Sequence, residues 1–269
     1  MSAAERGAYL PEGARPSGAT CTARHAPPPA LARSVATYFS VSLPSGSRGS
    51  VRTLPEGCAD LMFDLGSQPR AWLSGPRTRA RVFEHAGPVQ LLGAQLQPGV
   101  ARLLASTPAR ELLDATLPLE HALADGTRAV PALLGTLLQA TDTPARCAAL
   151  DRFLLQRLAG NAVDPRVSLA VQSVIECAGA ADVAELARSV AASPRNLTRL
   201  FHAWVGTSPK LFCRTVRFQS VLRHLGGGNK PDWAALAAEL GYADQSHLIR
   251  DFSDFAQVSP GALGEAPTA

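Results

Sequence analysis

The feature that most constrains the fold is an internal repeat in the last third of the chain. Residues 186–209 recur as residues 236–260, at an offset of 50 that becomes 51 after one extra residue in the second copy. The copies share a leucine, an arginine, two aromatic residues and a closing Ser-Pro, which are Leu197, Arg199, Phe201, Trp204, Ser208 and Pro209 against Leu248, Arg250, Phe252, Phe255, Ser259 and Pro260. Such a spaced repeat of apolar anchors indicates one supersecondary unit used twice.

Each copy is predicted to form a helix, a tight turn and a second helix. Asp182 and Asp232 stand where a side-chain oxygen caps a helix N-terminus, and Ser193 precedes a proline at the first position of the next helix. A further helix over residues 209–225 joins the copies and carries apolar residues on two sides, as expected of a rod packed between two bodies. We therefore expect about seven helices after residue 163.

The second helix of each copy has an apolar face and an opposite polar face. At about 100° per residue, Leu197, Leu200 and Phe201 share one side of the first such helix. The opposite side carries Arg195, Arg199 and His202 flanked by Asn196 and Thr198 in the first copy, and Ser246, Arg250 and Ser253 flanked by His247 and Ile249 in the second. Arginine can donate two hydrogen bonds to guanine, and asparagine can pair in a similar way with adenine. A solvated face explains either helix alone, but two copies at matched positions favour a surface that reads DNA.

The distribution of charge points the same way, although the net charge of +4 is mild. No Asp or Glu occurs over residues 186–231. That span carries eight basic residues, which are Arg188, Arg195, Arg199, Lys210, Arg214, Arg217, Arg223 and Lys230. A basic stripe favours a polyanionic partner, and Arg217 on the joining helix is a candidate phosphate contact. The alternative is an ordinary solvated surface, because arginine is the usual cation throughout this chain.

The first half of the chain reads as short strands followed by helices. Residues 59–65 alternate between apolar and other side chains, with Ala59, Leu61, Phe63 and Leu65 on one face and Asp60, Met62 and Asp64 on the other. Further short strands, broken by Gly and Pro, predict a small antiparallel sheet or barrel before residue 98. The expected fold class is α+β: a small antiparallel β domain with helices, followed by an all-α domain that contains two helix-turn-helix motifs.

The C-terminal segment resembles a known family. Residues 241–252, GYADQSHLIRDF, are similar to the G[FY]-x-[DS]-Q-S-H-[FL]-x-R-x-F signature of AraC/XylS transcription regulators, and residues 206–210 and 217–218 resemble the family's first motif and joining helix. The resemblance covers residues 165–262 and implies two recognition helices in successive major grooves, roughly 34 Å apart. The DNA-reading residues that it implies are Arg195, Asn196, Thr198 and Arg199, then Gln245, Ser246, His247, Ile249 and Arg250. His202, from the polar face, completes the predicted DNA-binding set.

Three positions depart from the family's pattern. Ala191 stands where the first motif often has glycine, Ala243 where a serine usually caps, and Gln257 where glycine is usual. Because Asp244 can take over the cap, the departures concern the geometry of the turns.

The N-terminal half also resembles a family. Residues 54–66, LPEGCADLMFDLG, are similar to the LP[DE]GC-x-D-L-x-F motif of the DUF6597 domain, which is found before such DNA-binding domains, and residues 95–99 fit its later part. The implied role is sensing or dimerisation. We therefore expect a disordered leader over 1–24, a sensor or dimerisation domain over 25–162 and a DNA-binding domain over 163–269. The expected partners are double-stranded DNA, a small-molecule effector of unknown identity and a second copy of the chain.

Other kinds of site find little support. The five cysteines are dispersed without disulfide or metal spacing, and we expect no cofactor. No run approaches the roughly 20 apolar residues of a membrane span and no signal peptide is apparent, so we expect a cytoplasmic protein. Cys58 could be a sensor thiol, but no cation adjacent in sequence would lower its pKa, which favours a small buried side chain.

Candidate metal and catalytic groups are equally weak. The three scattered histidines that could be imagined as a metal site are His25, His85 and His121. They lack the short spacing typical of such sites. Asp60 and Asp64 could form an acid–base pair, but an outward strand face is the favoured interpretation because no nucleophile or partner base accompanies them. We expect that the protein is not an enzyme. Two alternative interpretations stay open: a small-molecule enzyme within residues 25–160, and a protein-interaction module whose arginines bind an acidic partner.

Overall fold

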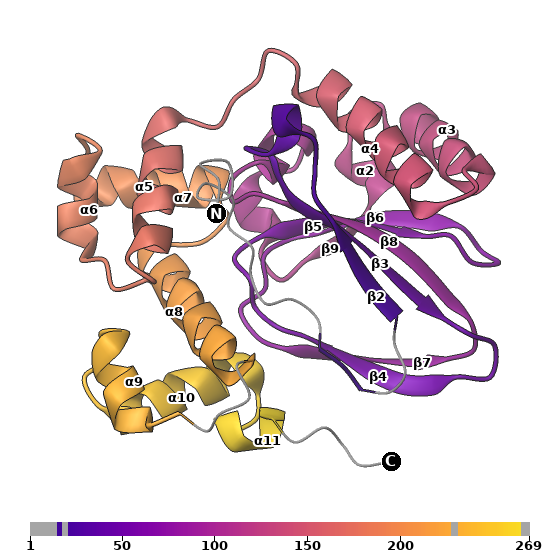
Figure 1. The fold of residues 1–269 in the computed structure, drawn as a ribbon. Helices are drawn as coiled ribbons and strands as arrows, with labels where there is room; N and C mark the ends of the chain where they lie inside the picture. Colours follow the sequence, from indigo (N-terminus) through magenta and orange to yellow (C-terminus); the bar gives the residue numbers. More distant parts are fainter. Residues whose placement is uncertain (1–14, 18–20, 227–230, 265–269) are drawn as a thin grey trace.

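The computed structural model describes residues 15–17, 21–226 and 231–264, which form a β part followed by a helical part (Figure 1). The β part lies against one side of the helical part. Within the helical part, one long helix runs diagonally between an upper and a lower group of shorter helices. This arrangement confirms the expected α+β class and its order along the chain.

Two antiparallel sheets make up the β part. The strands are β1 Arg15–Ser17, β2 Cys21–His25, β3 Val35–Leu43, β4 Arg48–Thr53, β5 Ala59–Asp64, β6 Arg70–Ser74, β7 Arg81–Ala86, β8 Val89–Leu96 and β9 Thr116–Pro118. One sheet has the order β2-β3-β8-β5-β6-β9 and the other the order β1-β4-β7. The chain therefore crosses between the sheets at the β1–β2, β3–β4, β4–β5, β6–β7 and β7–β8 connections.

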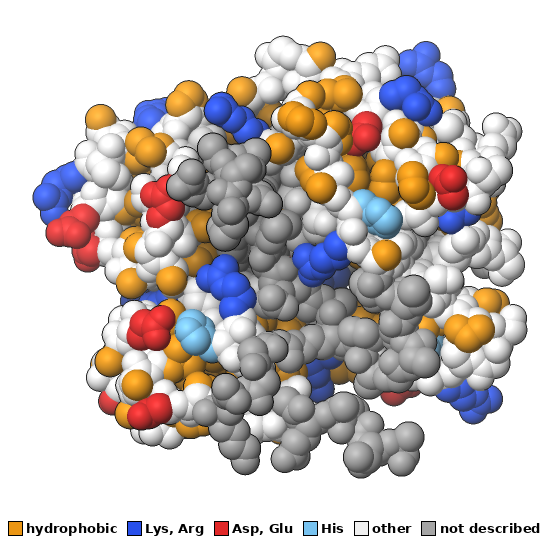
Figure 2. Space-filling model, viewed as in Figure 1, with side chains coloured by type: hydrophobic (Ala, Val, Ile, Leu, Met, Phe, Trp, Pro, Cys, Tyr) orange, Lys and Arg blue, Asp and Glu red, His pale blue; other side chains and the backbone are white. Residues whose placement is uncertain are grey.

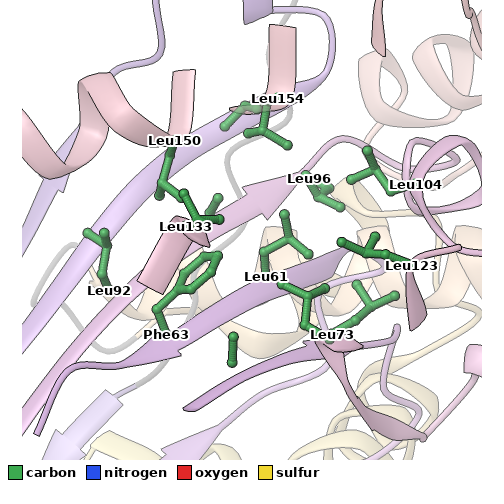
Figure 3. Packing of buried hydrophobic residues seen from close by; sticks show 14 of the residues in the cluster. Leu61, Phe63, Leu73, Leu92, Leu96, Leu104, Leu123, Leu133, Leu150 and Leu154 are labelled. Atoms are coloured by element: carbon green, nitrogen blue, oxygen red, sulfur yellow. The ribbon is translucent and has the colours of Figure 1, made fainter. Parts of the chain in front are cut away.

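Helices cover one face of the six-stranded sheet (Figure 1). The helices of the β part are α1 Ala101–Leu104, α2 Leu119–Ala122, α3 Gly126–Gln139 and α4 Thr143–Leu158, with 3-10 helices η1 Pro29–Leu31 and η2 Ala109–Leu112. Leu61 and Phe63 of β5 are fully buried and point at leucines of α3 and α4, such as Leu133 and Leu150 (Figure 3). The alternation seen in the sequence is thus the core face of β5. The hydroxyl of Tyr38 on β3 also donates to Asp151 on α4, at 2.6 Å.

The helical part contains the predicted number of helices within the described residues. They are α5 Pro165–Glu176, α6 Val183–Ser189, α7 Pro194–Trp204, α8 Pro209–Gly226, α9 Trp233–Glu239, α10 Gln245–Ala256 and α11 Pro260–Gly264. Side chains cap the N-termini of all seven of these helices, namely Asp164, Asp182, Ser193, Ser208, Asp232, Asp244 and Ser259. These caps satisfy backbone N–H groups that have no partner inside the helix, so the polar residues between the apolar runs define where the helices begin.

Two apolar cores lie on either side of α8. The first helical core, from α5, α6, α7 and the first half of α8, includes Phe201, Phe212 and Val216. The second helical core, from α9, α10 and the second half of α8, includes Phe218 and Phe252. Each fully buried phenylalanine contributes roughly 1.5–3 kcal/mol by leaving water. The prediction that the joining helix packs between two bodies is confirmed.

Some expectations about the N-terminal half were wrong. Residues 1–24 were expected to be a disordered leader, but Arg15–Ser17 pairs with β4 and Cys21–His25 pairs with β3. Residues 1–14 and 18–20 lie outside the described residues. Strand β3 itself is nine residues long. Pairing partners distant in sequence stabilise these strands, which local composition does not reveal.

The turn inside each helix-turn-helix motif contains one residue in the left-handed region. Ala191 has φ of 51° in the first turn, and Gly241 has φ of 70° at the matching place in the second. This conformation costs an L-residue roughly 1–2 kcal/mol, whereas glycine adopts it freely. The missing glycine noted in the first motif therefore coincides with a strained alanine.

We expect Ala191→Gly to raise the free energy of unfolding by up to about 1 kcal/mol, since the strain that it relieves exceeds the added flexibility of glycine. The reverse change, Gly241→Ala, should lower it by about 1 kcal/mol or more, because its Cβ would also lie 3.2 Å from Ala180 Cβ. Denaturant unfolding of both variants measures this. A destabilised Ala191→Gly protein would contradict it.

Candidate nucleic-acid interface

The candidate interface is formed by α7 and α10, the second helix of each motif. Each begins at a side-chain cap: the Ser193 hydroxyl accepts from the Asn196 N–H at 3.2 Å, and the Asp244 carboxylate accepts from the His247 N–H at 2.7 Å. Leu197 on α7 and Leu248 on α10 are fully buried. Because their inner faces are fixed in this way, the helices present their polar sides outward.

All ten predicted DNA-binding residues lie at the surface. Six are exposed, namely Arg195, Arg199, His202, Gln245, Ser246 and Arg250; four are half-buried, namely Asn196, Thr198, His247 and Ile249. Neither polar face is packed away against the rest of the protein. The face shown in Figure 2 mixes basic, acidic and apolar side chains without one large basic patch.

Several of these side chains already have partners within the motif. The Arg199 guanidinium donates to the Asn196 side-chain oxygen at 2.8 Å, and the Thr198 hydroxyl donates to the Pro194 carbonyl at 2.9 Å. The His247 ring lies edge-on to Tyr242, with ring centroids 5.3 Å apart. These contacts orient the first turn of each helix, where the residues that reach base edges are expected to lie.

Two arginines of the basic stripe connect α8 to the second motif. Arg214 on α8 donates from Nε to the buried Asp251 carboxylate on α10 at 2.8 Å. Burial alone would lower the pKa of Arg214, but hydrogen bonding to Asp251 and its charge raise the pKa above the ordinary value. The pair therefore ties α10 to α8.

Arg217 is the second of these arginines. It donates to the Gly241 carbonyl at 3.1 Å and lies over the Tyr242 ring, 4.9 Å from its centroid. These contacts link α8 to the turn of the second motif, and the suggested phosphate contact stays a prediction. A guanidinium on an aromatic face is stabilised by cation–π attraction, which a count of charges in the sequence does not reveal.

The β part touches both motifs, which the sequence did not predict. The side-chain amide of Gln219 on α8 donates to the Pro55 carbonyl at 2.6 Å. The Ala80 N–H donates to the Phe255 carbonyl at the end of α10, at 2.7 Å, and Arg52 donates to the neighbouring Ala256 carbonyl at 3.1 Å. The sequence signal at this contact was the LPEGC string of residues 54–58, but its composition does not show that it packs against α8.

A row of polar side chains crosses the other face of the six-stranded sheet. Strand pairing places Thr37, Gln95, Asp60 and Ser74 side by side on β3, β8, β5 and β6. Glu56 hydrogen-bonds to Gln95, and the Arg77 guanidinium donates to Ser74 at 2.7 Å. The expected outward solvated face for Asp60 was wrong, because this face is covered and one carboxylate oxygen of Asp60 is buried.

Burial governs the protonation of the polar row. It raises the pKa of Asp60 to about 7, against the lowering effects of Arg77 and Arg24. It also raises the pKa of Glu56 well above its usual range, and the charge of Asp60 adds to this. Within the described residues, three buried atoms of the row have no hydrogen-bond partner, namely Asp60 Oδ1, Gln95 Oε1 and Arg77 Nη1. Such atoms are typical of a place occupied by water or a polar ligand.

The remaining candidates are weaker. Burial raises the pKa of the Cys58 thiol well above its usual range, opposite to what a reactive thiolate needs. Among the residues that the structure describes, no three His, Cys, Asp or Glu side chains are grouped so that they could hold a metal ion. None of the described helices combines the length and hydrophobicity that crossing a bilayer requires.

Comparisons with known protein families find one match in the N-terminal half of the chain and a second in the C-terminal third. Residues 23–118 match a domain of unknown function (DUF6597), and residues 186–266 match a helix-turn-helix domain. No curated protein matches the sequence.

Solved structures of ToxT from Vibrio cholerae are similar over most of the chain. A 1.65 Å structure has 10% identity and a TM-score of 0.43, covering 94% of this chain and 98% of that one. An unsaturated fatty acid-bound ToxT has 9% identity and a TM-score of 0.41, covering 95% and 96%. This chain therefore matches a DUF6597 domain in its first half and a helix-turn-helix domain in its last third.

Proposed function

We propose that the protein is a sequence-specific DNA-binding transcription regulator in which α7 and α10 read successive major grooves. Residues 163–269 would be the DNA-binding domain and residues 25–162 the sensor domain. The observation that carries the proposal is that two matched helices, joined by one rod, both leave their polar faces exposed. Each face offers an arginine at the same place in the repeat, Arg199 and Arg250.

The chemistry of the two faces suits direct reading of bases. A correctly placed arginine discriminates its base pair by roughly 1–3 kcal/mol, and two grooves on one side of a duplex are one helical turn apart. The two faces differ in composition, since α7 offers Arg195 and Asn196 where α10 offers Ser246 and His247. The two half-sites should therefore differ in sequence.

A selection of bound duplexes from a randomised pool tests the proposal. The wild-type protein should select two sequence blocks about one helical turn apart. Arg199→Ala should relax selection in one block and Arg250→Ala in the other, each weakening binding to the parent duplex by roughly tenfold or more.

Arg152→Ala is the matched control, because Arg152 is exposed on α4 of the β part and its loss removes the same charge. It should leave the selected sequence unchanged. If the pool yields no preferred sequence, or if both arginine variants relax the same block, the proposed reading of two grooves is wrong.

We further propose that the β part senses an effector. The polar row supports this, since three of its buried polar atoms have no hydrogen-bond partner among the described residues and Glu56 belongs to the turn that touches α8. Open hollows of about 520 and 230 Å³ lie beside residues 78–81 and contain neither Glu56 nor Asp60. These two hollows therefore do not adjoin the carboxylates of the polar row. A homodimer stays a prediction, which sedimentation of the whole chain would test.

The polar row makes stability depend on pH. Because the pKa of Asp60 is raised to about 7 in the folded protein, the folded state holds a proton that the unfolded state releases near pH 4. The free energy of unfolding should therefore fall as pH rises from about 4 to about 7, by at most about 1.4 kcal/mol per pH unit for each such group.

Asp60→Asn should make the free energy of unfolding depend less on pH. Part of the dependence should remain because of Glu56, whose pKa is also raised. Asp64→Asn is the control, because Asp64 lies on the same strand face but pairs with the exposed Arg70 at 3.4 Å. Urea unfolding between pH 4.5 and 8 measures the slope. An unaltered slope in Asp60→Asn would show that its carboxyl does not carry the proton.

A further inference from the structure

The 54–58 turn of the β part supplies one buried side chain to each helical core. Leu54 is 2% exposed and belongs to the second helical core, with Phe218 and Phe252. Cys58 is 4% exposed and belongs to the first, with Phe201 and Phe212. One short segment of the N-terminal half therefore takes part in the packing of both helix-turn-helix units.

The turn also contacts α8 directly between these two residues. The Gln219 side chain, 1% exposed, donates to the Pro55 carbonyl at 2.6 Å. Gly57 has φ of +72°, and a Cβ there would lie 2.9 Å from Phe212 Cε2 and 3.6 Å from Thr215 Cγ2. Positions 212, 215 and 219 follow the i, i+3, i+7 spacing of one helix stripe. The turn thus covers this stripe of α8, next to both helical cores.

Other contacts of the β part reach the far ends of the two units. In the first motif, Gly206 lies so near η2 that a Cβ would be 2.5 Å from the Ala109 carbonyl oxygen. In the second, the Phe255 and Ala256 carbonyls at the end of α10 accept from Ala80 and Arg52. Each unit is therefore held at α8 and again near the end of its recognition helix.

We propose that the 54–58 turn is a brace that sets the position of α7 relative to α10, and so the spacing of half-sites that the protein accepts. This rests on the proposed reading of two grooves. A helix as long as α8 can bend gently, so packing along one stripe, with a residue in each core, restrains the angle between the units. Glu56, in the middle of the brace, links it to the polar row, which is where an effector would act on spacing.

Spacing selectivity distinguishes a brace from a residue that only adds stability. The full chain is assayed on the duplex selected by the wild-type protein and on derivatives with 2 or 5 base pairs inserted between the half-sites. The wild-type protein should lose roughly tenfold or more in affinity for the insertions, because one helix then misses its bases. Gly57→Ala and Leu54→Ala should bind the parent duplex more weakly and lose less than about threefold on the 2-base-pair insertion.

Gly46→Ala is the matched control. Gly46 also has a left-handed φ, +83°, but a Cβ there has no neighbour within 4 Å, so it carries the backbone strain without the contact to α8. It should keep the wild-type spacing selectivity.

Gln219→Met is a milder change, since it removes the hydrogen bond to Pro55 with little change in volume. It should reduce the selectivity for half-site spacing while the thermal unfolding transition stays cooperative.

The possible failures are distinguishable. If Gln219→Met and whichever turn variants fold all keep the wild-type ratio between parent and inserted duplexes, the brace is wrong and α8 alone sets the spacing. That result leaves the proposed function standing. If the wild-type protein itself selects no sequence, the proposed function fails first, whatever the variants do.

Discussion

The burial of α8 between two helical cores and the 54–58 turn is the constraint on which the rest of the structure depends. Phe212 and Val216 pack in the first helical core, and Phe218 packs in the second. The 54–58 turn lies over the stripe of α8 that carries Phe212, Thr215 and Gln219, and Gln219 donates to the Pro55 carbonyl there. Because a helix covered in this way has little freedom to rotate, the recognition helices on either side of it are held by packing rather than by their own short turns.

The arginines of the helical part divide into two kinds that composition does not separate. The guanidinium groups of Arg199 and Arg250 are exposed. By contrast, Arg214 pairs with Asp251, and Arg217 contacts the Gly241 carbonyl and the Tyr242 ring. A buried carboxylate such as Asp251 is costly unless it is paired, so Arg214 is committed to the fold. The basic stripe is therefore partly an internal scaffold, and fewer of its cations are free to meet DNA than the sequence indicates.

The repeat, the caps and the polar faces could be predicted because they depend on interactions within a few residues. Asp244 caps α10 in place of the usual serine, and the strained Ala191 marks the expected departure in the first turn. The strands β1 and β2 were missed because their partners lie elsewhere in the chain. Asp60 was placed on a solvated face because alternation distinguishes two faces of a strand but not what covers the second one.

The sequence by itself determined the two helix-turn-helix units and the side chains that they expose, since helix periodicity and capping are local. Only the tertiary structure decided that the β part contacts both units through Leu54 and Cys58, and that Glu56 and Asp60 share a half-buried polar row. The physical reason is that burial depends on segments far apart in the chain. A carboxylate or a turn reads the same in the sequence whether water or another domain lies against it.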